Sequence, residues 1–277
     1  MNIFQAIVLG IVEGLTEFLP ISSTGHLTIV ENLLGLPVSD LGVTAFTALV
    51  QVGAILAVLV YFRADITRLA IGWSRGLFHP PARDRQEWRF GWYIILGSLP
   101  IAVVGLAGKD LISSSRNLWV VASALIGWSA VMAYAERRAT QRRSESDLRL
   151  SDALWIGAAQ CIALIPGVSR SGATISAGLL RGLDRVTATR LSFFLSIPAM
   201  TAAGVFEGID AAAPINSTVG WAPTITATAV AFLVAYATIA WLLKFVAHHK
   251  ITVFIWYRIA AGLVLAVALT AGLMNPT

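Results

Sequence analysis

Long apolar blocks recur along this chain, and they constrain its fold more than any other feature. Residues 119–135 carry no charged side chain, and residues 253–273 carry a single one, Arg258. A bilayer core of roughly 30 Å needs about 20 mainly apolar residues per helix. Only 13% of all residues are charged, against roughly 25% in soluble domains. The chain is therefore predicted to be an integral membrane protein.

We expect an all-α polytopic fold with about six transmembrane helices in a single membrane domain, 1–277. The expected spans are 43–62, 91–108, 118–135, 190–207, 222–245 and 253–273. Two arginine-rich loops, 63–90 and 136–152, are assigned to the cytoplasm because positive charge accumulates on that side. Both chain termini then lie outside. The net charge of +5 follows from these loops and indicates topology, with no nucleic acid as a partner.

Two further apolar segments, 1–42 and 153–189, are interrupted by polar residues, proline and glycine. Each fits a re-entrant helical hairpin better than a span, because irregular backbone within a membrane must be buried in protein or line a wet cavity. Glu31 and Asp40, near the end of the first segment, are expected in solvated loops.

The two hairpin segments resemble each other when the chain is shifted by 147 residues. Ser22 then falls on Ser169, and Gly25 falls on Gly172. Three predicted spans separate the segments, so the second copy is expected to be inverted. We predict a first repeat over 1–62 and a second, inverted repeat over 153–207. Inverted repeats with broken helices place a site near the midplane of the membrane, at the repeat interface.

Glu13 and Glu17 lie four residues apart, on one face of a helix. A carboxylate at the centre of a spanning helix costs about 2.5–3.5 kcal/mol on insertion scales. The pair fits proton transfer, metal binding or ion coupling. A salt bridge to a distant arginine is the alternative.

Hydroxyl-bearing residues and one histidine follow this acidic pair at once: Ser22, Ser23, Thr24 and His26. Serine and threonine here can cap the next helix, and a helix N-terminus is also an anion site. A neutral imidazole can accept a proton from a serine. The segment therefore predicts either a helix cap alone or a cap that also holds a nucleophile.

The second hairpin contains Pro166-Gly-Val-Ser-Arg-Ser-Gly-Ala-Thr174. Gly167 allows close backbone approach to a ligand, and Ser169, Ser171 and Thr174 supply hydroxyls. Arg170 is a permanent cation whose planar fork suits phosphate oxygens. The pattern predicts an anionic ligand. The alternative is that Arg170 only neutralises Glu13 or Glu17.

These two motifs, Glu13 to His26 and Pro166 to Thr174, resemble those of the bacterial undecaprenyl-diphosphatase (bacitracin-resistance) family, and the resemblance covers essentially the whole chain. It implies hydrolysis of undecaprenyl diphosphate to undecaprenyl phosphate and phosphate, which recycles the lipid carrier for cell-wall synthesis. It also implies a place in the bacterial cytoplasmic membrane, with a site that opens to the outer face.

The resemblance further implies roles for individual residues. Glu13 and Glu17 belong to the acidic motif and are the expected ligands of a divalent cation, Mg²⁺ or Ca²⁺. Ser23 and His26 are expected to be catalytic. Arg170 is expected to be catalytic within a phosphate-binding motif, and the residues expected to contact substrate are Ser22, Thr24, Gly167, Ser169, Ser171 and Thr174.

Two other classes of membrane protein share part of this pattern. Ser23-Thr24-Gly25-His26 is faintly similar to a motif of type 2 phosphatidic acid phosphatases, but the histidine which that class needs seven residues after Ser169 is Ser176 here. A lipid-phosphate translocase or ion-coupled transporter would also show inverted repeats and membrane carboxylates. A serine beside a histidine favours chemistry. The oligomeric state stays open, with a homodimer among the alternatives.

Overall fold

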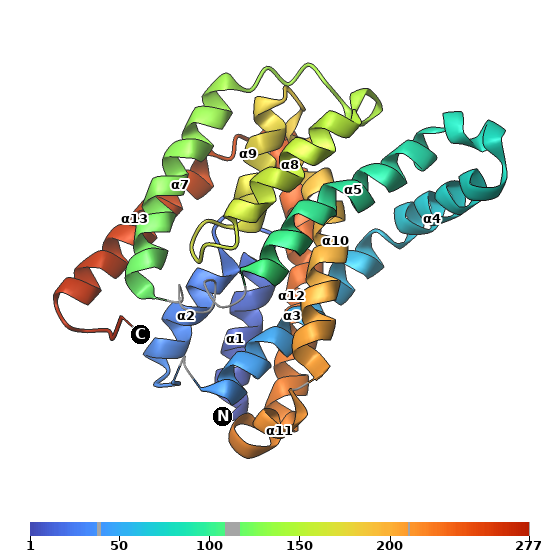
Figure 1. Ribbon diagram of the computed structural model, residues 1–277. Coiled ribbons are helices and arrows are strands. Elements are labelled where there is room, and N and C mark those ends of the chain that lie inside the picture. Colours follow the sequence, from blue (N-terminus) through green and yellow to red (C-terminus); the bar gives the residue numbers. More distant parts are fainter. Residues whose placement is uncertain (38–39, 109–116, 210, 277) are drawn as a thin grey trace.

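The computed structural model describes residues 1–37, 40–108, 117–209 and 211–276, and these residues form helices joined by short connections (Figure 1). The main helices are α1 (Ile3–Thr16), α2 (Ser23–Leu33), α3 (Leu41–Tyr61), α4 (Arg63–Phe78), α5 (Gln86–Ala107), α7 (Leu118–Arg138), α8 (Leu150–Ile162), α9 (Arg170–Leu180), α10 (Arg185–Ile209), α12 (Trp221–His248) and α13 (Thr252–Thr270). Short helical turns are η1 (Pro80–Asp84), η2 (Glu145–Asp147), α11 (Ala212–Pro214) and η3 (Ile215–Val219). The all-α prediction is confirmed.

Five of the described helices are long and apolar enough to cross a membrane, namely α3, α5, α7, α12 and α13. They coincide with five of the predicted spans. The sixth prediction, 190–207, lies within α10, which has 25 residues but is not among the five. Ser192 and Ser196 of α10 are buried, and α10 packs against α3, α5 and α9. Polar side chains inside a membrane are tolerated where they face the interior of the helix bundle.

The segment 63–90, predicted to be a loop, is largely helical. It contains α4 and η1, and α5 already begins at Gln86. Ile66, Leu69 and Trp73 recur at the spacing of one helix face, a pattern that the many arginines obscured. In Figure 1, α4 and the start of α5 extend away from the other helices. Asp65 joins this arm to α10 through a 3.0 Å ion pair with Arg190.

Both re-entrant segments consist of two short helices with a break between them. The first pair is α1 and α2, and the second pair is α8 and α9. Ser22 and Ser169 end the two breaks with positive φ angles of 77° and 78°, which few non-glycine residues adopt. Their hydroxyls accept hydrogen bonds from Gly25 N at 3.4 Å and Gly172 N at 3.1 Å. Each serine therefore caps the helix that follows it.

The two broken hairpins start at opposite ends of the molecule, and their breaks meet at mid-height (Figure 1). Helices α2 and α9 begin and end at positions that correspond under the shift of 147 residues. The helices packed against the two hairpins correspond as well. In the first hairpin α1 packs on α12, and in the second hairpin α8 packs on α5. Helices α7 and α13 pack on each other. These observations favour the inverted repeat, whose boundaries at 1–62 and 153–207 stay a prediction.

Two glycines at corresponding positions allow α8 to approach α5 closely and α1 to approach α12 closely. A Cβ atom on Gly157 of α8 would lie 1.9 Å from the Gly97 carbonyl oxygen of α5. A Cβ atom on Gly10 of α1 would lie 2.6 Å from the Ala227 carbonyl oxygen of α12. Small residues at such crossings let helix backbones touch inside a membrane, and these contacts fix where each hairpin enters.

Candidate active site

Three residues singled out in the sequence meet where the two breaks face each other. Ser23 Oγ donates a 2.5 Å hydrogen bond to Glu17 Oε2, and Arg170 Nη2 donates a 2.7 Å hydrogen bond to Glu17 Oε1. Glu17 caps the end of α1, Ser23 opens α2, and Arg170 opens α9. The Glu17 side chain is only 4% exposed. A buried carboxylate thus joins a hydroxyl to a guanidinium from the other hairpin.

Arg170 is placed for both roles that its motif predicts, a salt bridge to a glutamate and the binding of an anion. One terminal nitrogen, Nη2, neutralises Glu17 as the alternative required. The other, Nη1, is buried and has no hydrogen-bond partner among the described residues. Buried donors are nearly always paired, and a guanidinium with a free nitrogen is a strong donor to a phosphate oxygen. The arrangement therefore leaves one cationic donor available for an anion.

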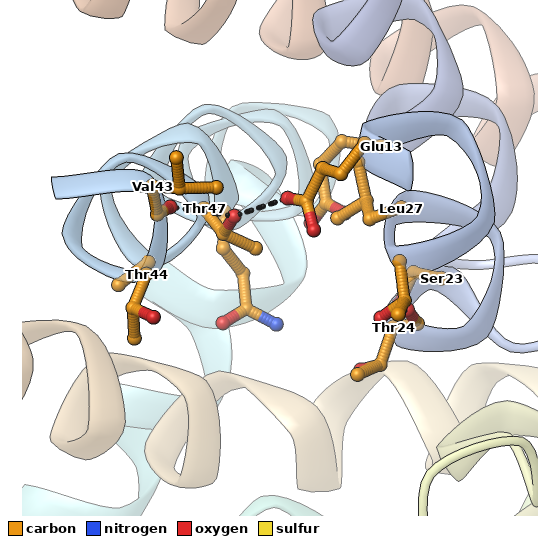
Figure 2. A pocket seen from close by; sticks show the side chains of 11 residues that line it. Glu13, Ser23, Thr24, Leu27, Val43, Thr44 and Thr47 are labelled. Carbon is orange, nitrogen blue, oxygen red and sulfur yellow. Dashed lines mark hydrogen bonds between the residues drawn. The ribbon is translucent and has the colours of Figure 1, made fainter. Parts of the chain in front are cut away.

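Glu13 lies one helical turn before Glu17 and is 1% exposed. Its Oε1 atom has no partner in the described part of the chain. The residue borders a cavity of about 90 Å³ between α2 and α3. Figure 2 shows Thr44 and Thr47 of α3 facing Ser23 and Thr24 across this cavity. The residues that line it are Glu13, Ser23, Thr24, Leu27, Thr28, Glu31, Val43, Thr44, Thr47, Ala48 and Gln51.

The prediction that Glu31 lies in a solvated loop is wrong. Helix α2 continues to Leu33, so Glu31 is helical and only 3% exposed. Its Oε1 accepts a 2.7 Å hydrogen bond from Thr47 Oγ1. Asp40, expected in a solvated loop as well, caps the start of α3 by accepting from Gly42 N and Val43 N. The cavity is thus polar along both of its helical walls.

His26 does not pair with Ser23, contrary to the expectation for a serine–histidine couple. Its Nδ1 lies 2.7 Å from the Ser22 carbonyl oxygen, and its Nε2 lies 2.8 Å from the Tyr257 hydroxyl. The two rings also stack, with an interplanar angle of 14°. In a neutral imidazole, the nitrogen that faces a carbonyl carries the proton, and the other nitrogen accepts. Tyr257 therefore donates to His26, and Glu17 occupies the place of the base beside Ser23.

The hydroxyls of the second motif have partners within the protein. Ser171 Oγ donates to the Leu19 carbonyl oxygen at 2.9 Å, which links the two breaks. Thr174 Oγ1 donates to Ser192 Oγ at 2.6 Å. Gly167 adopts a φ of 97°, and a Cβ atom there would lie 2.7 Å from the Val121 carbonyl oxygen. In this arrangement these residues shape the break that presents Arg170.

Two residues of α13 at this site were not predicted from the sequence. Tyr257 contacts His26 as described, and Arg258 is fully buried with hydrogen bonds to the Pro20 and Gly167 carbonyl oxygens. The available signal was one charge inside an otherwise uncharged span. Such a residue faces the protein interior or a wet cavity in nearly all cases.

The residues present fit a divalent cation in part. Carboxylate oxygens, such as those of Glu13, are ligands that Mg²⁺ and Ca²⁺ prefer, and the cavity has room for the water molecules that complete their coordination. Both oxygens of Glu17, however, already have partners. Among the described residues, no group of three or more histidine, cysteine, aspartate or glutamate side chains is placed to hold a metal ion.

Fold and site together define a class: multi-pass α-helical membrane proteins in which two broken hairpins bring a hydroxyl, a carboxylate and a guanidinium into one buried site. Residues 6–264 match the family described as bacitracin resistance protein BacA, and the chain belongs to this family.

Curated relatives match along the whole chain. Undecaprenyl-diphosphatase 3 of Frankia casuarinae is 56% identical, with 100% of both chains covered. Undecaprenyl-diphosphatase of Cutibacterium acnes is 54% identical, with 96% of both covered. Undecaprenyl-diphosphatase of Acidothermus cellulolyticus is 52% identical, with 99% of both covered.

Proposed function

We propose that this protein hydrolyses undecaprenyl diphosphate to undecaprenyl phosphate and inorganic phosphate. The observation that carries the proposal is the contact of Ser23 with Glu17, which in turn is held by Arg170. A hydroxyl bonded to a carboxylate that is oriented by a third group is the arrangement of an activated nucleophile. The names of the relatives, at 52–56% identity over the whole chain, support the same substrate and reaction.

In the proposed first step, Ser23 Oγ attacks the terminal phosphorus of the diphosphate. The bond from that phosphorus to the bridging oxygen breaks, and undecaprenyl phosphate leaves with the electron pair. Glu17 accepts the serine proton. Arg170 Nη1, which has no partner among the described residues, stabilises the charge on the transferring group, because electrostatics and positioning supply most of the catalysis in phosphoryl transfer.

In the proposed second step, water attacks the phosphorus of the phosphoserine, and the bond from that phosphorus to Ser23 Oγ breaks. Glu17 returns its proton to Ser23 Oγ as inorganic phosphate leaves. The cavity beside Ser23 is polar and has room for several water molecules. Glu13 lines this cavity and has one carboxylate oxygen without a partner among the described residues, so we assign it the proton of the attacking water. In the competing pathway Ser23 only orients a water molecule that attacks directly. Trapping of phosphate on Ser23 distinguishes the two pathways.

As the alternative to this role as a base, we propose Glu13 as the main protein ligand of a divalent cation. Such a cation would supply charge neutralisation for the diphosphate. A readout separate from activity is thermal stability, which Mg²⁺ or Ca²⁺ should raise in the wild type and leave unchanged in Glu13→Gln.

The proposed location is the cytoplasmic membrane, with the site open to its outer half. The cavity is lined by Val43 to Gln51 in the first half of α3, whereas the other end of α3 leads to Arg63 and the basic arm. Positive charge near the ends of spans favours the cytoplasm. The undecaprenyl tail would then leave sideways between helices into lipid.

A translocase would need no nucleophile and base, so the Ser23–Glu17 bond favours hydrolysis over transport. The test is phosphate release from undecaprenyl diphosphate by purified protein in detergent. Ser23→Ala, Glu17→Gln and Arg170→Ala are measured beside the wild type, with divalent cation present or chelated. We expect turnover in the wild type and a loss of at least about a thousandfold in Ser23→Ala.

Binding of the lipid without any phosphate release by the folded wild type would contradict the hydrolase and favour a translocase. Full activity in Ser23→Ala would leave the reaction intact but remove Ser23 as its nucleophile.

A further inference from the structure

In the part of the chain that the structure describes, the largest fully buried side chain is a cation inside a spanning helix. Arg258 of α13 has an exposed fraction of 0%. Its hydrogen bonds go to neutral oxygens: Nε donates to Ser129 Oγ at 3.2 Å, and the two terminal nitrogens donate to backbone carbonyls. Burial of a guanidinium within a membrane is costly, so a side chain kept there without a carboxylate in these contacts calls for an explanation.

The carbonyls that Arg258 binds come from both helix breaks. Nη1 donates to the Pro20 oxygen at 3.3 Å, and Nη2 donates to the Gly167 oxygen at 2.9 Å. Pro20 and Gly167 correspond under the same shift of 147 residues that relates Ser22 to Ser169. One guanidinium therefore holds equivalent points of the two hairpins with its two terminal nitrogens.

Broken helices leave carbonyl groups without intrahelical partners, and inside a membrane these must be satisfied by protein. Several residues could do this separately for each break. A guanidinium does it for both at once, and its planar fork fixes the spacing and relative orientation of the two carbonyls. Nη2 also donates to the Ala124 oxygen of α7 at 3.2 Å, so Arg258 connects both breaks to a third element, α7.

The proposed nucleophile and the proposed phosphate-binding guanidinium lie equally far along the chain from the two carbonyls that Arg258 binds. Ser23 is three residues beyond Pro20, and Arg170 is three residues beyond Gly167. Resting on the proposed hydrolytic function, we infer that Arg258 is a positioning residue that sets the placement of the nucleophile on one hairpin relative to the phosphate-binding guanidinium on the other. It acts through the backbone of both breaks, whereas Glu17 links the same groups through side chains.

The test separates positioning from folding through a split between kcat and KM. Arg258→Lys keeps the charge but replaces the fork by a single ammonium group. We expect kcat to fall about a hundredfold, since a displacement of about 1 Å can cost that much, while KM changes less than about threefold. Ser129→Ala is the matched control, because it removes one bond of Arg258 but neither break carbonyl, and it should keep kcat within about twofold.

An unchanged kcat in folded Arg258→Lys, with an active wild type, would overturn the inference and leave the proposed function intact. Inactive wild type would overturn the proposed function itself. Arg258→Gln, which buries no charge, is measured in the same way in case the lysine variant does not fold. Failure of both variants to fold would assign Arg258 a role in folding and contradict a positioning role.

Discussion

At the scale of single residues, Glu17 is the centre of the candidate site. Its two carboxylate oxygens have different partners, Ser23 on one hairpin and Arg170 on the other. Loss of the Arg170 contact leaves the buried Glu17 charge without its cation, which is far more costly than loss of an exposed ion pair. Loss of the Ser23 contact removes a hydrogen bond to a buried carboxylate. Small changes at this point are therefore expected to have large effects on activity.

Replacement of Arg170 by lysine should lower kcat/KM about 100- to 1000-fold. A lysine ammonium is a compact charge and cannot hold Glu17 and also reach a phosphate with a second rigid donor. The measurement is phosphate release, with thermal unfolding to verify the fold. Arg181→Lys is the matched control, because Arg181 lies at the other end of α9 and pairs with Asp152. A loss below tenfold in Arg170→Lys would contradict the proposed role.

His26 and Tyr257 should behave as one unit. We expect His26→Ala and Tyr257→Phe each to lower kcat/KM about tenfold, the equivalent of about 1.4 kcal/mol for a hydrogen bond of this kind. The double variant should be little worse than either single variant, because both remove the same contact. Additive losses in this double-mutant cycle would show that His26 also acts directly on the substrate.

At the scale of elements, close helix crossings hold the hairpins in place. Gly157→Val would drive a side chain into the Gly97 carbonyl of α5, and overpacking of this kind costs about 1–3 kcal/mol or more. We expect a lower unfolding temperature and reduced activity in detergent. Gly127→Val is the control, since nothing lies within 4 Å of a Cβ atom on Gly127 of α7. Equal stability of the two variants would contradict this packing.

At the scale of the whole molecule, both chain ends lie at the same end of the structure (Figure 1), as the predicted topology requires, and the proposed orientation places that end outside. In a Cys161→Ser background, Asn275→Cys should react with an impermeant thiol reagent in intact cells. Ser146→Cys, in the opposite basic segment, should react only after permeabilisation. Both positions are exposed, so the reverse pattern would invert the proposed orientation.

The sequence by itself determined the membrane class, five of the spans and both broken hairpins. These features are local in the sequence: apolar blocks of about 20 residues, and their interruption by proline, glycine and serine. Their structural consequences follow from the thickness of the bilayer core and its lack of water. The residues of the central contact, Glu17, Ser23 and Arg170, were also predicted, because charged and hydroxyl groups within apolar segments are conspicuous. The helix α4 was missed, since its arginines were read as a sign of a loop.

Only the tertiary structure decided which of these groups touch. Glu17 and Arg170 are separated by 153 residues, and Arg258 and Pro20 by 238. Neither helical period nor hydropathy extends over such separations. The pairing of Ser23 with Glu17 and of His26 with Tyr257 depends on how the breaks and α13 pack. The sequence therefore named the reactive groups, while packing between distant helices assigned them their partners.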